Sequence, residues 1–130
     1  MPFVGREETN SAMIIRPEDA SVYNLAGGGE AQLLLTGDKT GGAWWMGRVR
    51  EDPRFMTQLH YHPKTDEQVY VLEGVLSVYA DNAWHELGRG TLGVLPHGKP
   101  HAQGNRSENP VHYPAYPRVL RISSQQWTGS

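Results

Sequence analysis

Four side chains that commonly bind transition metals stand at close spacings in two segments of this chain. His60 and His62 are one residue apart and Glu67 follows after four more, whereas His101 lies in a second segment. Imidazole nitrogen and carboxylate oxygen suit a divalent transition metal, and the chain has no cysteine to supply a thiolate. We therefore predict that these four residues bind one Fe, Mn, Ni, Co, Cu or Zn ion, with positions left open for water, oxygen or substrate.

The two histidines of the first segment require an extended chain to face the same way. Over residues 55–62 a strand would place His60 and His62 on one face, because alternate side chains of a strand share a face. Gln58 lies two residues before His60 and would share that face. It is a candidate contact to substrate, although its place near the mouth of the site favours the alternative that it has no function.

Glu67 is preferred to its neighbour Asp66 as the acidic ligand. In a strand over residues 67–74, Glu67 shares a face with Val69 and Val71. This valine-rich face is the one expected to point inward. Glu67 is therefore carried toward the histidines and Asp66 away from them.

The second segment contributes His101 and one further polar neighbour. A short strand over residues 101–103 places Gln103 on the same side as His101. Gln103 is therefore a candidate contact to substrate or to a metal-bound water, with a packed or solvent-facing amide as the alternative. The other three histidines are interpreted as surface residues or as supports of the site. Two tyrosines near the C-terminus could either cover the mouth of the site as a lid or pack beneath the C-terminal segment. These residues are His85, His97, His112, Tyr113 and Tyr116.

Short apolar runs between turn residues predict about ten strands, which favours an all-β sandwich or closed barrel. The 15 glycines and 9 prolines fit this turn-rich plan. Trp44 and Trp45 fall on opposite faces of one run and are interpreted as packing residues. The C-terminal segment is predicted to be an extended edge or crossing segment and not a central strand, because it contains Pro110, Pro114 and Pro117. The further predicted strands cover residues 12–15, 21–25, 31–35, 43–50, two runs within 75–87, 91–95 and 119–123.

Size and charge limit the function classes. A chain of 130 residues fits one domain, and 12 basic against 14 acidic residues give a formal net charge of -2. No segment gathers the basic residues, so nucleic acids and anionic membranes are poor candidate partners. No apolar run approaches the roughly 18 residues of a membrane span, and the first residues do not resemble a secretion signal. A cytoplasmic protein is therefore expected.

Both segments resemble the two sequence motifs of the cupin superfamily. The first reads His60-x-His62, four residues, Glu67, six residues, Gly74. The second reads Gly90, five residues, Pro96-x-Gly98, two residues, His101, three residues, Asn105. The 15 residues 75–89 separate them, as in compact bacterial cupins. The departure is Arg54, which stands where the family usually has a glycine and belongs to a turn, not to the ligands.

The stretch LLLTGDKTGGAWW, ahead of the first motif, is similar to the quercetin-dioxygenase-like branch of small cupins. The resemblance covers roughly residues 30–106. It implies a jelly-roll, or double-stranded β-helix, barrel with the metal inside, and often a homodimer. One cupin domain over 1–130 is expected, with an N-terminal arm (1–11), a metal-site core (55–106) and a C-terminal extension (107–130).

The leading hypothesis for function is a quercetinase-like dioxygenase acting on a small aromatic or enolic substrate. In that reaction the resemblance implies two roles for Glu67, as metal ligand and as the base that takes the substrate proton. The second hypothesis is a redox-neutral, metal-dependent isomerase, cyclase or lyase acting on a polyketide-like or carbonyl substrate. The third is a non-enzymatic cupin that binds a metal or a small ligand.

Overall fold

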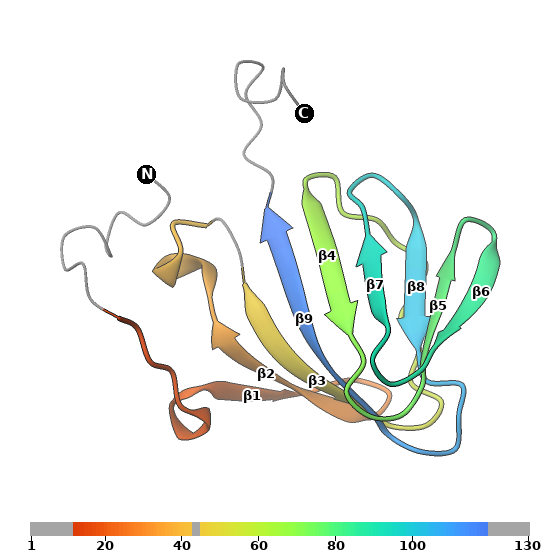
Figure 1. Cartoon of the computed structure of the whole chain (residues 1–130), viewed down its shortest axis with the longest axis horizontal. Helices are drawn as coiled ribbons and strands as arrows, with labels where there is room; N and C mark the ends of the chain where they lie inside the picture. Colours follow the sequence, from red (N-terminus) through yellow and green to blue (C-terminus); the bar gives the residue numbers. More distant parts are fainter. Residues whose placement is uncertain (1–11, 43–44, 120–130) are drawn as a thin grey trace.

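The computed structural model describes residues 12–42 and 45–119, and these residues are nearly all-β (Figure 1). One antiparallel sheet has the strand order β1-β2-β3-β9-β4-β7 and a second has the order β6-β5-β8. Two short 3-10 turns, η1 (Pro17–Asp19) and η2 (Gly37–Lys39), are the helical elements of the described residues. The strands are β1 (Ser21–Asn24), β2 (Gly29–Leu35), β3 (Met46–Glu51), β4 (Thr65–Tyr70), β5 (Leu76–Ala80), β6 (Ala83–Leu87), β7 (Leu92–Leu95), β8 (His101–Gly104) and β9 (Val111–Val119).

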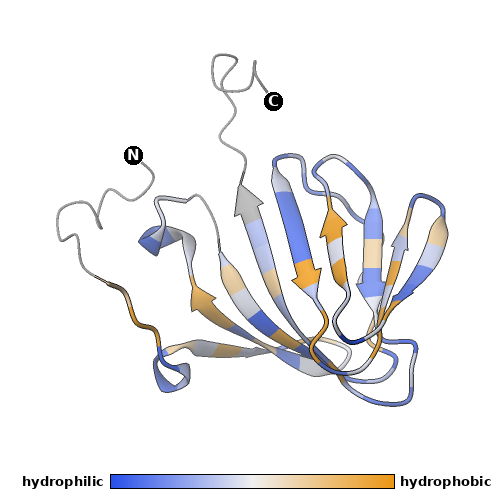
Figure 2. Ribbon diagram, viewed as in Figure 1, coloured by the Kyte–Doolittle hydropathy of each residue, from blue (hydrophilic) through white to orange (hydrophobic). Residues whose placement is uncertain are grey.

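The apolar core lies between the inward faces of these strands, so the predicted all-β jelly-roll barrel is confirmed. Figure 2 shows apolar residues on β4 and β7 and hydrophilic residues in many of the loops that join the strands. The alternation of buried and exposed side chains follows from the two-residue period of a strand. No helix among the described residues is long and apolar enough to cross a bilayer. The core comprises Val69, Val71, Leu76, Val78, Leu87, Leu95, Val111, Tyr113 and Ala115.

The late prolines lie in a strand inside the large sheet, so the prediction of an edge or crossing segment is wrong. β9 pairs with β3 through its first half and with β4 through its second half. The last residue pair between β4 and β9 is Val69–Ala115, so Pro114 lies just outside this ladder. The missing N–H of Pro114 therefore removes no hydrogen bond to β4. The Pro117 carbonyl accepts from the Trp45 N–H on the β3 side. Because N–H and C=O of one strand residue point the same way, the Pro117 nitrogen faces away from β4 and interrupts no bond there.

The histidine segment, residues 55–62, is extended but is not the continuous strand that was predicted. It meets β8 through isolated bridges. The Thr57 N–H donates to Gln103 O, and the His60 N–H donates to His101 O. Between these two hydrogen bonds the histidine segment moves three residues along its chain, from Thr57 to His60, whereas β8 moves only two. The extra residue is a β-bulge, which interrupts the strict alternation expected across the segment.

Two expectations about the N-terminal part have different outcomes. Residues 12–15 form no strand, and within the described chain the large sheet ends at β1. The ring of Trp45 packs directly against Gly37, because a Cβ added to Gly37 would lie 2.9 Å from it. This contact agrees with the packing role predicted for Trp45. The predictions for residues 1–11, Trp44 and residues 120–123 lie outside the described residues.

Arg54 adopts a backbone conformation that favours glycine, which is the usual residue at this position of the family motif. Its φ is 75°, in the left-handed region, which costs a residue with a side chain roughly 1–2 kcal/mol. Its N–H donates to Asn105 O at 2.8 Å, which fixes the turn against the end of the second motif. The departure from the motif therefore changes the residue and keeps the turn.

Gly74 sits where the chain passes close to the segment that leads into β9. Its φ is 88°, and an added Cβ would lie 2.8 Å from the Val111 Cα and closer still to Pro110 O. Gly74→Ala is therefore expected to lower the free energy of unfolding by about 2–4 kcal/mol, because backbone strain and overlap both oppose the methyl group. Urea denaturation measures this, with Gly88→Ala as control, since nothing lies within 4 Å of a Cβ added there. Equal stability of the two variants would contradict the prediction.

Candidate metal centre

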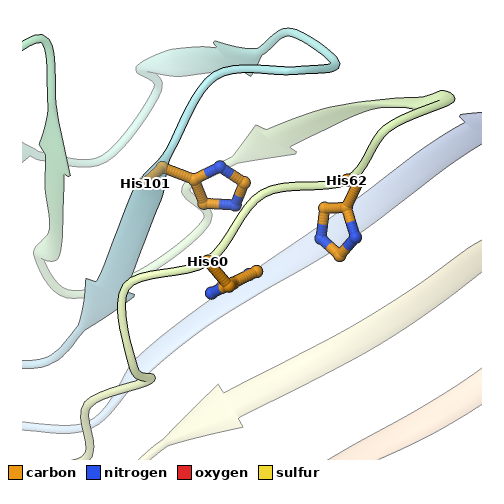
Figure 3. A group of neighbouring side chains, drawn as sticks. All are labelled: His60, His62 and His101. Carbon is orange, nitrogen blue, oxygen red and sulfur yellow. The ribbon is translucent and has the colours of Figure 1, made fainter.

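Three histidine rings face one another at the predicted site (Figure 3). His60 and His62 come from the extended segment before β4, and His101 is the first residue of β8. One ring nitrogen from each residue lies within 4.8 Å of those of the other two. The ring centroids of His60 and His101 are 4.5 Å apart, and those of His60 and His62 are 5.0 Å apart. The structure therefore brings together three of the four predicted ligands.

Backbone carbonyls fix the orientation of two of these rings. Nδ1 of His60 lies 2.6 Å from Gln58 O, and Nδ1 of His101 lies 3.3 Å from Lys99 O. Because a carbonyl only accepts, we assign the ring proton to Nδ1 in both residues, which leaves a lone pair on Nε2. Nε2 of His101 is buried and has no hydrogen-bond partner among the described residues. A buried nitrogen in this state fits a metal ligand.

The electrostatic environment favours the neutral, ligating form of His62 and His101. Burial lowers the pKa of His62 and of His101, and the charge of His60 lowers both further, while the Lys99 carbonyl opposes this at His101. Neutral imidazole is the form that binds a metal, so the lone pairs are available at neutral pH.

Glu67 lies next to the histidines, with Oε1 4.0 Å from Nε2 of His62. It projects from β4 on the same face as the fully buried Val69. Its side chain is 15% exposed, and burial raises its pKa, although His60 acts in the opposite direction. Among the described residues, the close-spaced group contains only the three histidines, and the role of Glu67 as fourth ligand stays a prediction.

Asp66 binds the loop that precedes His101. Its Oδ1 accepts from the His97 N–H at 2.8 Å and lies 2.9 Å from His97 Nδ1. His97 therefore supports the loop of the second motif. His85 and His112 also lie outside the three-histidine group. The contacts with Asp66 fit the supporting role expected for His97, and the roles of His85 and His112 stay predictions.

Gln58 and Gln103 differ in what they present to the site. The bulge between Thr57 and His60 removes the reason for placing the Gln58 side chain on the ligand face, and that side chain is exposed. Gln58 acts on the site through its carbonyl, which orients His60. Gln103 is buried, and its Nε2 donates to the Tyr113 hydroxyl at 2.8 Å. Substrate contact by either glutamine stays a prediction.

A second polar group, which we call the Glu51 cluster, consists of Glu51, Gln103 and Tyr113. The Tyr113 hydroxyl accepts from Gln103 Nε2 and donates to Glu51 Oε2. The three residues come from β3, β8 and β9, so the cluster joins the two sheets. Burial raises the pKa of Glu51 to about 7; hydrogen bonds from Tyr113 and Gln103 oppose this, and the charge of Glu67 adds to it.

Sequence reasoning missed Glu51 and left Tyr113 between two roles. Glu51 follows Val49 by two residues in β3, so extending the alternation by one pair predicts a carboxyl group on the inward face. Tyr113 is almost fully buried, which excludes a lid role for this residue. Its hydrogen bond to Glu51 spans 62 positions of sequence, and no local pattern indicates such a pair.

The sequence profile of the cupin domain, Cupin_2, matches residues 47–116, which is more than half of the chain. The chain belongs to the cupin family. The matched region contains every residue of the three-histidine group, Glu67 and the whole Glu51 cluster. No curated protein matches the sequence of this cupin.

Solved structures similar to this cupin have different activities in their names. A predicted oxalate decarboxylase from Thermotoga maritima has a TM-score of 0.72 at 19% identity, covering 83% of this chain and 100% of that chain. The polyketide cyclase RemF from Streptomyces resistomycificus has a TM-score of 0.68 at 16% identity, with coverages of 88% and 89%. A sugar phosphate isomerase from Silicibacter pomeroyi has a TM-score of 0.59 at 28% identity, with coverages of 78% and 69%. The first two likenesses show the fold alone, which does not determine a substrate.

Proposed function

We propose that this cupin is a metal-dependent enzyme acting on a small organic substrate that carries an enol or carbonyl oxygen. The observation that carries the proposal is the convergence of His60, His62 and His101, two of them oriented by backbone carbonyls. With Glu67 as the fourth ligand, such a donor set leaves coordination positions open. An open position is typical of catalytic sites and not of structural ones.

In this proposal the chain supplies a base next to the ion. Burial raises the pKa of Glu67, which brings its carboxyl group closer to the pH range in which it can take and return a proton. Glu67 takes the proton of the substrate enol or of the carbon next to a carbonyl. A bound divalent ion would supply Lewis-acid stabilisation of the resulting oxygen anion or a binding position for dioxygen.

Two reaction classes use such a base. Oxygenation of a flavonol-like enol by a quercetinase-like dioxygenase is supported by the resemblance of the segment before His60. A redox-neutral isomerase, cyclase or lyase reaction is favoured by one specific observation, the second buried carboxyl group at Glu51. Moving a proton between two substrate atoms uses an acid and a base, whereas oxygenation of an enol begins with the loss of one proton.

Metal loading combined with oxygen measurement separates the two classes. The chain loaded with a redox-active ion is expected to consume oxygen in proportion to the flavonol that disappears, and a chelator is expected to stop both. Zinc-loaded protein is the control, because zinc has no redox chemistry. Conversion of a carbonyl or polyketide-like substrate in the absence of oxygen would assign the redox-neutral class instead. Stoichiometric metal without conversion of either substrate type would contradict an enzymatic role and leave a binding function.

The homodimer and the cytoplasmic location stay predictions. A partner subunit would find apolar side chains on the outer face of the large sheet, where β7, β4 and β9 are adjacent. Tyr70 and Leu92 are paired across β4 and β7, and both are exposed. Exposed apolar side chains at paired positions favour this face for a dimer contact.

A further inference from the structure

The Glu51 cluster contains two buried oxygens without a hydrogen-bond partner among the described residues. They are Oε1 of Glu51 and Oε1 of Gln103. Glu51 is 1% exposed and Gln103 is 8% exposed, so neither atom meets bulk solvent. Buried polar atoms are nearly always paired with protein or with an ordered bound group. Each of these two oxygens can therefore take part in one further hydrogen bond.

The direction of the hydrogen bonds decides what each oxygen offers. Gln103 donates through Nε2 to the Tyr113 hydroxyl, so Gln103 Oε1 is a free acceptor. The Tyr113 hydroxyl donates to Glu51 Oε2, so a proton on the Glu51 carboxyl belongs on Oε1. No ion pair joins Glu51 to a basic side chain in the described part of the chain. Burial without a cation favours the neutral acid, and the pKa of about 7 agrees with this.

We propose that Glu51 and Gln103 form a hydroxyl-binding subsite inside the barrel, which holds a hydroxyl group of the substrate beside the metal centre. A hydroxyl fits because it accepts from the Glu51 carboxylic acid and donates to Gln103 Oε1. Tyr113 positions both side chains, since its hydroxyl bonds to each of them. The inference deepens the proposed function and rests on it.

The place of Gln103 on β8 indicates the size of the ligand. Gln103 lies two residues after His101 on the same face of the strand, which is about 7 Å along the backbone. A ligand that reaches both would bind the ion through one oxygen and the subsite through a hydroxyl several bonds away. The ligand class is therefore a hydroxylated organic molecule larger than a simple dicarboxylate, such as a polyhydroxylated aromatic compound.

Infrared difference spectroscopy tests the Glu51 proton without any ligand. A protonated carboxyl group has a C=O stretch that the ionised form lacks, so the metal-free chain is expected to lose such a band between about pH 6 and about pH 8. Glu51→Gln is expected to lack the band, and Tyr113→Phe to shift it. Glu30→Gln is the control, because Glu30 is exposed and pairs with Arg50. Absence of a Glu51-dependent band at about pH 6 would overturn the subsite.

Two flavonols test whether the subsite binds a hydroxyl group. Quercetin and 3-hydroxyflavone share the keto-enol unit that can bind an ion, and quercetin carries additional ring hydroxyls. Zinc-loaded protein is expected to bind quercetin about tenfold more tightly, because a hydroxyl satisfies the two buried oxygens. Gln103→Met is expected to remove this difference without changing the zinc content. Equal affinities in the unaltered protein would overturn the subsite alone, and binding of neither flavonol to zinc-loaded protein would overturn the flavonol-type reaction of the proposed function together with the subsite.

Discussion

His101→Ala is expected to weaken metal affinity by at least about 100-fold and to leave the purified protein nearly free of metal. His101 is the most buried of the three histidines, and its Nε2 has no partner within the described protein. Its removal leaves two more exposed imidazoles and one carboxylate that lies 4.0 Å from His62. Elemental analysis after gel filtration of protein grown with each metal supplement measures the effect.

The matched control for this experiment is His85→Ala. His85 is an exposed histidine of β6 whose Nε2 lies 3.2 Å from Ala80 O, and it stands outside the three-histidine group. Its replacement is expected to leave the metal content at that of the unaltered protein. Stoichiometric metal in folded His101→Ala protein would contradict the assignment of His101 as a ligand.

The placement of His60, His62 and Glu67 could be predicted from sequence because it depends on local geometry. His60 and His62 are two residues apart in an extended chain, and Glu67 follows in a strand that also carries the buried Val69. Within such a strand, one apolar face is enough to determine which side chains point inward. The choice of Glu67 over Asp66 needed no knowledge of the partner strands.

Gln58 shows where this reasoning stops. Its expected face depended on an uninterrupted alternation from residue 55 to residue 62. The bulge arises from the pairing of Thr57 and His60 with residues of β8, which follow more than 40 positions later. A bulge of this kind is set by the two strands together, so the sequence of one strand does not reveal it.

The prediction from the prolines of β9 was wrong for a related reason. A proline is excluded from a strand interior only where its missing N–H would face a bonded neighbour. Pro114 lies just beyond the β4 ladder and Pro117 turns its nitrogen away from β4. Register between strands distant in sequence decides both cases, and composition alone carries no information about register.

Glu67→Gln is expected to keep the metal and to lower turnover by about 10²–10⁴-fold. The amide oxygen can still face the ion, but the side chain can no longer take a proton. Burial raises the pKa of Glu67 in the metal-free chain, whereas a bound cation would lower it by favouring the carboxylate. The activity of the metal-loaded unaltered protein should fall as the pH drops through the pKa of Glu67, and the residual activity of the variant should lack that step.

Oxygen uptake or anaerobic product formation as a function of pH, on protein of measured metal content, tests this prediction. Glu73→Gln is the matched control, because Glu73 is exposed and its recorded hydrogen bonds run through its backbone to His112. The control should keep both the rate and the pH dependence of the unaltered protein. Full turnover by metal-loaded Glu67→Gln would exclude Glu67 as the base. Loss of the metal itself would show instead that the charge of the carboxylate is required for binding, because Oε1 of the amide could not replace it.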